Sequence, residues 1–222
     1  MIKILPIVRD VYPTTKFGIM VVHGVSNLVE RTCMDTLKNT EINQIKQEHK
    51  EYERKSALNT SPICHYVSYY KSFKKTYPVL LQLESILLKD KGIPNVGIPV
   101  ETMFLAEVKN MLLTAGHDLD QIKGKLTMNL AGGVECYQSI SGKEQILTKN
   151  DLFLSDESGI LSSILNGPDF RTQITKTTQN ALYFVYGVEG VTEEQIRKHL
   201  ENIGDYLTTV NPDVGIETIE VY

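Results

Sequence analysis

The stretch Ile93–Ala131, IPNVGIPVETMFLAEVKNMLLTAGHDLDQIKGKLTMNLA, joins two kinds of sequence pattern. Its first half predicts a helix that begins at Pro99, because apolar residues follow with helical spacing and proline favours the first turn. Gly116 is expected to end this helix. The last part, Lys125–Ala131, alternates as a strand does. Polar side chains gather between the two, in Thr114–Asp120, and this corner is the first candidate for a site.

The chain before this stretch has mainly helical patterns. A buried strand is predicted at Lys16–Val25. Helical spacing then extends over much of Ser26–Gly92, and it includes Leu28 and Val29. Within it, Ser61 and Pro62 predict the N-cap and first residue of a new helix.

The chain after this stretch has mainly strand patterns, separated by turns rich in glycine, serine and asparagine. The further predicted strands are Glu135–Ile140, Leu152–Ser155, Gly159–Leu165, Asn180–Val188 and Gly215–Tyr222. One helix interrupts them, where Thr192 and Gln195 form a capping box. Helices followed by strands indicate an α+β fold with a mostly antiparallel sheet. No linker or repeat divides the chain, so we expect a single domain over residues 1–222.

Composition excludes several classes of protein. Of the 222 residues, 41% are hydrophobic and 23% charged, as in ordinary globular proteins. No apolar run approaches the ~20 residues of a membrane helix, and the apolar patch at the N-terminus is too short for a signal peptide. We therefore expect a cytoplasmic protein without a membrane partner. Cys33, Cys64 and Cys136 are odd in number and have no metal-ligand spacing, so we expect buried or free thiols and no metal.

The charge is divided unevenly along the chain. Residues 1–100 carry 14 lysines and arginines against 9 acidic residues, whereas residues 101–222 carry 9 against 18. Lys71, Lys74 and Lys75 lie among aromatic residues in Tyr69–Tyr77, YYKSFKKTY. This pattern suits the phosphates and stacked bases of RNA. The alternative is a solvated helix face whose aromatic stripe turns inward.

No hydrolase, phosphate-loop or dinucleotide motif is present, so we expect no cofactor. The first candidate for chemistry is TAGHDLD at Thr114–Asp120. There His117 beside Asp118 could act as a general base or hold a water. The alternative is a helix C-cap in which Asp118 and Asp120 cap the next turn.

The second candidate is the turn NGPDFRT at Asn166–Thr172. It brings Asp169, Arg171 and Thr172 close together. Arg171 could pair with an aspartate structurally, or it could clamp a carboxylate or phosphate. Asp156, in SDESG, is a third candidate, for which an Asx turn is the alternative.

Several blocks carry a resemblance to a known family. In order, IPNVGIPVETMF, GHDLDQIKG, LFLSDESGI and TKTTQNALYFVYGV resemble the B3/B4 domain of the bacterial phenylalanyl-tRNA synthetase beta subunit. More closely, they are similar to the free-standing B3/B4 proteins related to it. The likeness covers about Phe17 to Leu207. It implies a layered β/β/α sandwich with helices on one side. In the synthetase this domain is the editing module, which hydrolyses tRNA mischarged with tyrosine using a positioned water.

The chain departs from the synthetase pattern at the site itself. Alignment on DLDQIKG puts Ala115 at the family's histidine and His117 at its phenylalanine. Alignment on TTQNALYF puts Phe184 at the position of the pocket glutamate. The synthetase's own arrangement for tyrosine is therefore not reproduced.

These observations lead to one main hypothesis, a tRNA-binding trans-editing deacylase acting on the 3′-aminoacyl end of mischarged tRNA. His117, oriented by Asp118, would activate the water, and backbone amides near Gly167 would stabilise the oxyanion. Lys71, Lys74 and Lys75 would bind tRNA. The residues expected to contact substrate are Asp156, Gly167, Asp169, Arg171, Thr172 and Lys109.

Two other hypotheses stay open, and neither involves DNA. The chain could be a non-catalytic module that binds RNA or a small amino-acid-like ligand. It could also be a protein-interaction domain, as B3/B4 domains sit within a larger assembly in the synthetase. The sequence leaves open whether the protein is an enzyme and which amino acid or tRNA it recognises.

Overall fold

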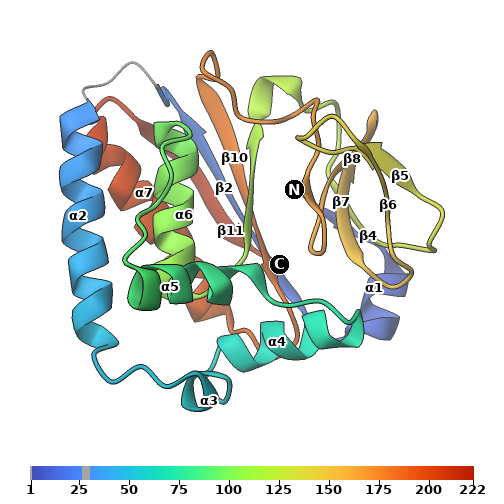
Figure 1. The fold of residues 1–222 in the computed structure, drawn as a ribbon. Helices are drawn as coiled ribbons and strands as arrows, with labels where there is room; N and C mark the ends of the chain where they lie inside the picture. The colour runs from blue at the N-terminus through green and yellow to red at the C-terminus, as the bar shows by residue number, and fades with distance from the viewer. Residues whose placement is uncertain (1, 27–30) are drawn as a thin grey trace.

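The computed structural model describes residues 2–26 and 31–222, which form two main β-sheets and a group of helices (Figure 1). The helices are α1 (Pro6–Val11), α2 (Arg31–Glu48), α3 (Arg54–Ala57), α4 (Ile63–Ser72), α5 (Pro78–Lys89), α6 (Ile98–Asn110), the 3-10 turn η1 (Leu119–Gln121) and α7 (Glu193–Val210). The strands are β1 (Lys3–Ile4), β2 (Lys16–His23), β3 (Thr114–Asp118), β4 (Thr127–Leu130), β5 (Cys136–Gln138), β6 (Glu144–Ile146), β7 (Leu152–Asp156), β8 (Gly159–Ser163), β9 (Gly167–Pro168), β10 (Asn180–Gly187) and β11 (Gly215–Val221). The helical positions expected at Leu28 and Val29 lie outside the described residues.

The sheets are mostly antiparallel, as predicted. One sheet has the order β11-β2-β10-β3, and every pair in it is antiparallel. The other has the order β1-β4-β7-β8-β9, in which β1 and β4 are the parallel pair. Strands β5 and β6 form a separate hairpin. The predicted strands after residue 125 correspond to β4, β5, β7, β8, β10 and β11.

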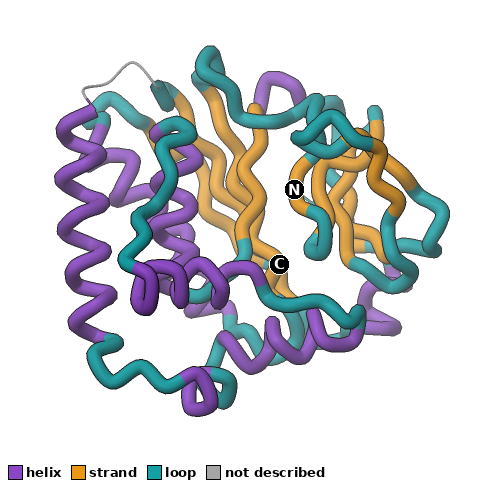
Figure 2. Tube along the Cα trace, viewed as in Figure 1, coloured by secondary structure: helices purple, strands orange, loops and turns teal. Residues whose placement is uncertain are grey.

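The layers follow from the alternation of side chains along β10. Tyr183 points to the helical side, where its hydroxyl donates to the carbonyl of Pro99 in α6. Tyr186 points the other way and bonds to Ser162 of β8 in the second sheet. Helices α6 and α7 thus cover one side of the four-stranded sheet, with α2 packed outside them, and the five-stranded sheet lies on the other side (Figures 1 and 2). This is the α+β, layered β/β/α arrangement expected from the sequence.

Helix α4 runs across the ends of both sheets and ties them together (Figure 1). Tyr66 donates from its hydroxyl to the carbonyl of Tyr186 in β10. Tyr70 donates to the carbonyl of Ile164, just past β8. Both tyrosines are buried, so each hydroxyl needs the partner it has. The space between the sheets is therefore fixed at this end.

The prediction for the end of the central helix is wrong. Helix α6 ends at Asn110, and Met111 takes the left-handed conformation with φ 55°. Thr114–Asp118 then form β3, an edge strand whose Ala115 pairs with Phe184 of β10. All five residues of β3 are buried. Small residues do not favour a strand by themselves, and pairing with β10 decides the conformation.

Other local differences have local causes. Helix α4 begins at Ile63, with Pro62 as its N-cap residue and no side-chain cap, so Ser61 does not cap it. Helix α5 ends with Asp90 in the left-handed conformation. The capping box of Thr192 and Gln195 is confirmed at the start of α7. Within residues 2–26 and 31–222, no helix combines the length and apolar character needed to cross a bilayer.

Candidate functional site

The two sequence candidates lie side by side at the edge of β3. The backbone amide of Asp118 donates to the carbonyl of Thr172 at 2.7 Å. His117 and Gln173 form an antiparallel bridge next to it. The turn that follows β9 therefore runs along the edge of β3, and it brings Asp169, Arg171 and Thr172 to His117.

His117 is the centre of a buried hydrogen-bond chain between the two sheets. Its Nδ1 lies 2.8 Å from the hydroxyl of Thr172, which donates to the Asp169 carboxylate. Its Nε2 lies 3.1 Å from Ser162 Oγ, which in turn lies 2.6 Å from the hydroxyl of Tyr186. Because Thr172 gives its proton to Asp169, its oxygen accepts from Nδ1–H. Nε2 then accepts from Ser162, and Ser162 from Tyr186.

This arrangement keeps His117 neutral and gives each of its ring nitrogens a hydrogen-bond partner. Burial, and to a smaller extent the nearby Arg171 guanidinium, lowers its pKa to about 3. Both ring nitrogens have protein partners, so no lone pair is free for a water. The imidazole therefore bridges the turn at Thr172 to β8, which is a positioning role in this geometry.

The expectation that Asp118 orients His117 is wrong. Successive residues of a strand point to opposite sides, so the two side chains diverge. The Asp118 carboxylate accepts from the hydroxyl of Thr178 at 2.6 Å and from the amide of Asp120 at 3.0 Å. Asp118 thus caps η1, as the alternative from the sequence expected, but that alternative's helix C-cap is not observed because α6 ends at Asn110.

Arg171 is engaged by the protein itself. Its Nη2 donates to Asp156 Oδ1 at 2.9 Å, and its Nη1 donates to the carbonyl of Gln121 at 2.7 Å. Asp156 also accepts from the amides of Ser158 and Gly159, as an Asx turn does. Arg171 and Asp156 therefore hold the turn against β7, and about a third of the Arg171 side chain stays exposed.

A cavity of about 540 Å³ lies beside these residues, between α5, α6, β3 and the turn after β9. We call it the α6–β3 cavity. Its walls are mostly apolar, and they include Pro78, Val79, Val96, Val100, Met103, Phe104, Leu113, Ile140, Pro168 and Ile174. Gly167, a predicted site residue, also lines it. His117, Asp118, Asp169, Arg171 and Thr172 are not among its lining residues.

A smaller cavity of about 190 Å³ adjoins the first and shares Pro78, Leu113, Thr114 and Gly167 with it. Ala115 lines this smaller cavity. Its cross-strand partner Phe184 is fully buried and stacks on Phe17. The two positions at which the chain departs from the synthetase pattern are thus direct neighbours, and both have apolar side chains here.

Glu107 is a functional candidate that is not among the residues predicted from the sequence. Among the described residues that line the α6–β3 cavity, it is the one with an ionisable side chain. Its Oε1 accepts from the amide of Thr114 at 2.7 Å, and burial raises its pKa to about 8. Helical spacing in the sequence indicates its position, because Glu107 lies four residues after Met103 and so falls on the apolar face of α6.

The predicted lysines occupy different places. Lys109 pairs with Glu41 of α2 at 2.6 Å and lies over the ring of Tyr206, away from the cavity. It lies there because α6 places it two residues, or about half a turn, beyond Glu107. The predicted contact of Lys109 with substrate in this cavity is therefore not supported by its position.

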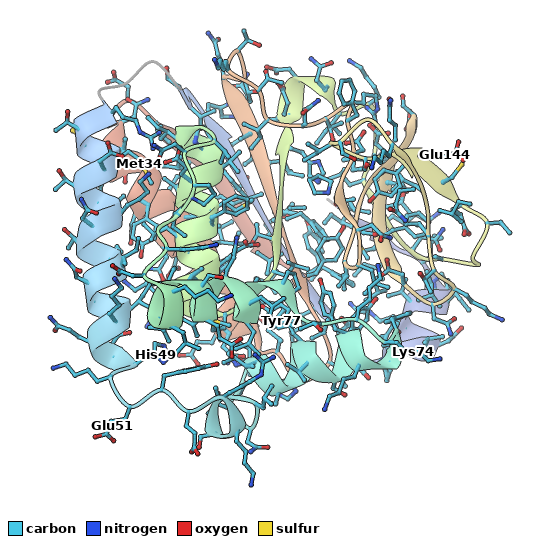
Figure 3. The ribbon with its side chains drawn as sticks, in the orientation of Figure 1. Met34, His49, Glu51, Lys74, Tyr77 and Glu144 are labelled. Carbon is cyan, nitrogen blue, oxygen red and sulfur yellow. The ribbon has the colours of Figure 1, made fainter. Side chains whose placement is uncertain are left out.

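Lys75 is the lysine of the YYKSFKKTY segment that reaches the site. Its Nζ donates to Asn166 Oδ1 at 3.0 Å, and Asn166 lines the smaller cavity. Lys74 lies past the end of α4, in a depression with Tyr12 near α1 (Figure 3). Lys71 is exposed on α4.

The aromatic residues of the same segment do not form a stacking surface for bases. Tyr69, Tyr70 and Tyr77 are buried, and Tyr77 lies in the interior of the protein (Figure 3). Their rings pack with one another and with Tyr66 and Phe73. The inward aromatic stripe, considered as the alternative from the sequence, is the observed arrangement.

Comparison with solved structures found an N-terminal fragment of the phenylalanyl-tRNA synthetase beta-subunit from Pyrococcus horikoshii. The TM-score is 0.50 and the sequence identity 12%, and the match covers 100% of this chain and 50% of that chain. The chain therefore spans about half the length of the structure that it matches. No protein-family model and no curated protein sequence matches the chain. The likeness confirms the fold implied by the sequence blocks.

Proposed function

We propose that this chain is a B3/B4-like module that binds an aminoacyl group with an apolar side chain in the α6–β3 cavity. The observation that carries the proposal is the cavity itself. Its volume of about 540 Å³ lies in the range of small-molecule sites, and apolar walls surround one carboxyl group. The fold, shared with part of a phenylalanyl-tRNA synthetase beta-subunit, supports an aminoacyl ligand.

Binding is tested by thermal unfolding in the presence of amino acids, amino acid amides and aminoacyl-tRNAs. A ligand that binds the folded state stabilises it by mass action, by about 2.7 kcal/mol at a hundredfold excess over Kd. Ligands with apolar side chains are expected to raise Tm, and those with charged side chains are not. An unchanged Tm with every ligand of the panel contradicts the proposal.

Hydrolysis of mischarged tRNA is the second candidate function. The likeness of fold to a synthetase fragment favours it, and so does Lys75, which lies beside the smaller cavity where a tRNA backbone could approach. Direct attack by water on the ester needs no protein nucleophile. From the sequence, His117 is expected to hold the water, but in that role its Nε2 would have to leave Ser162.

The deacylase proposal is tested with a panel of mischarged tRNAs under single-turnover conditions. A rate above spontaneous hydrolysis for one of them supports an enzyme. Rates equal to the protein-free control for every tRNA, together with binding in the thermal assay, leave the protein as a binding module.

A further inference from the structure

The carboxyl group of Glu107 has one oxygen satisfied and one available. Thr114 donates its backbone amide to Oε1. Among the described residues, the Glu107 side chain makes no other hydrogen bond and no ion pair with the protein. Every fully buried side-chain nitrogen or oxygen in this part of the chain has a partner. Oε2 therefore reaches open space, and Glu107 lines the α6–β3 cavity.

Among residues 2–26 and 31–222, no positively charged side chain pairs with this carboxyl group. The titratable groups near it are Tyr66, Tyr70 and Tyr77, whose pKa values burial raises, and all three stay neutral. His199, which bonds to the hydroxyl of Thr114, is also neutral, because burial lowers its pKa to about 3. A carboxylate in such surroundings is costly, and without a cation the group keeps its proton.

We propose that Glu107 recognises the amino group of the bound ligand, as an ammonium that pairs with Oε2 while the apolar side chain packs against Val100, Met103 and Ile174. This inference rests on the proposed function and specifies its ligand class. The described lining contains no lysine, arginine or histidine, so a free α-carboxylate would find no cation there. The site therefore favours an aminoacyl ester or amide over the free amino acid.

The pairing is linked to protons. At pH 6.5, Glu107 is protonated in the free protein because burial raises its pKa to about 8. An α-amino group with an ordinary pKa near ~7.7–8.0 is also protonated at this pH. Formation of the ammonium–carboxylate pair must therefore release close to one proton, and the affinity for the cation rises as the pH approaches 8.

The test uses isothermal titration calorimetry with the amides of leucine, methionine and phenylalanine. Each is paired with the carboxamide that lacks the α-amino group and with the free amino acid. We expect the amino amides to bind at least tenfold more tightly than either counterpart. In Glu107→Gln, which keeps an acceptor for Thr114, their affinity is expected to fall at least tenfold. Glu84→Gln is the matched control and is expected to bind as the wild type, because this buried glutamate of α5 pairs with Arg54 of α3.

Repetition at pH 6.5 in two buffers of different ionisation enthalpy measures the proton release, which is expected in the wild type and absent in Glu107→Gln. Equal binding of amino amides and their amine-free counterparts by the wild type, without proton release, overturns the role of Glu107 and leaves the proposed function intact. Failure of every probe to bind the wild type overturns the proposed function. These wild-type comparisons decide the matter even where Glu107→Gln does not fold.

Discussion

Replacement of His117 by leucine tests whether this histidine is a neutral bridge between the sheets. His117→Leu removes the bonds to Thr172 and Ser162 and leaves both hydroxyls short of a partner. Two lost buried hydrogen bonds predict a loss of about 2–4 kcal/mol in the free energy of unfolding at pH 7.5. At this pH the histidine is neutral in both the folded and the unfolded chain.

The destabilisation caused by His117→Leu is expected to become smaller as the pH falls. The pKa of His117 is about 3 in the folded protein, below its ordinary value of 6.5, so only the unfolded chain takes up the proton as the pH falls between these values. The wild type therefore loses stability through this window. Between pH 7.5 and pH 5, proton uptake by His117 in the unfolded chain lowers the free energy of unfolding of the wild type by about 2 kcal/mol, because the linkage is 1.36 kcal/mol per pH unit. The variant has no histidine at this position. The difference in the free energy of unfolding between the wild type and the variant, which we call the stability gap, is therefore expected to narrow by that amount.

Urea unfolding followed by circular dichroism measures the stability gap between the wild type and the variant at pH 7.5 and at pH 5. The other titrating groups, His199 included, are common to the two proteins and cancel in the difference. Leu83→Ala, at a buried residue without a titratable group, is the control, and its loss in the free energy of unfolding is expected to be the same at both pH values. A gap for His117→Leu that stays the same at both pH values refutes the assignment of a neutral, buried His117.

Three further predictions concern the cavity, a helix end and the basic segment. Gly116→Ala places a Cβ 2.9 Å from Ile174 Cδ1 and 3.3 Å from Met103 Sδ, so overpacking is expected to cost about 1–3 kcal/mol in urea unfolding and to weaken ligand binding. Thr192→Ala removes the capping box of α7 and is expected to cost about 1 kcal/mol, whereas Thr209→Ala near the other end of the helix should cost less. Lys75→Glu is expected to weaken tRNA binding in filter assays more than Lys74→Glu, because Lys75 lies beside the smaller cavity; equal effects contradict that placement.

Much of the fold could be predicted because local patterns and tertiary structure agree there. The alternation in Asn180–Val188 and the capping box at Thr192 each specify their own element, and both are observed. Strand β3 was missed because Thr114–Asp118 has no alternation of its own. Its conformation depends on β10, more than 60 residues later in the chain.

The site was predictable in part for the same reason. The turn at Asn166–Thr172 contains its own partners, so the proximity of Asp169, Arg171 and Thr172 followed from spacing. The hydrogen-bond partners of His117 did not follow from spacing. Ser162 lies on the other sheet and Thr172 in the turn after β9, and both are far from His117 in the chain. Once Thr114–Asp118 is taken as a strand, His117 and Asp118 point to opposite sides, which separates the predicted pair.

The central claim is that an aminoacyl group binds in the α6–β3 cavity, and methyl NMR tests it most directly. Titration with phenylalanine amide is expected to shift the methyl resonances of Val79, Val100, Met103 and Ile174, which line the cavity. The resonances of Ile219 and Val221, on the far edge strand β11, are expected to stay unchanged. Shifts confined to residues outside the cavity, or none at saturating ligand, contradict the claim.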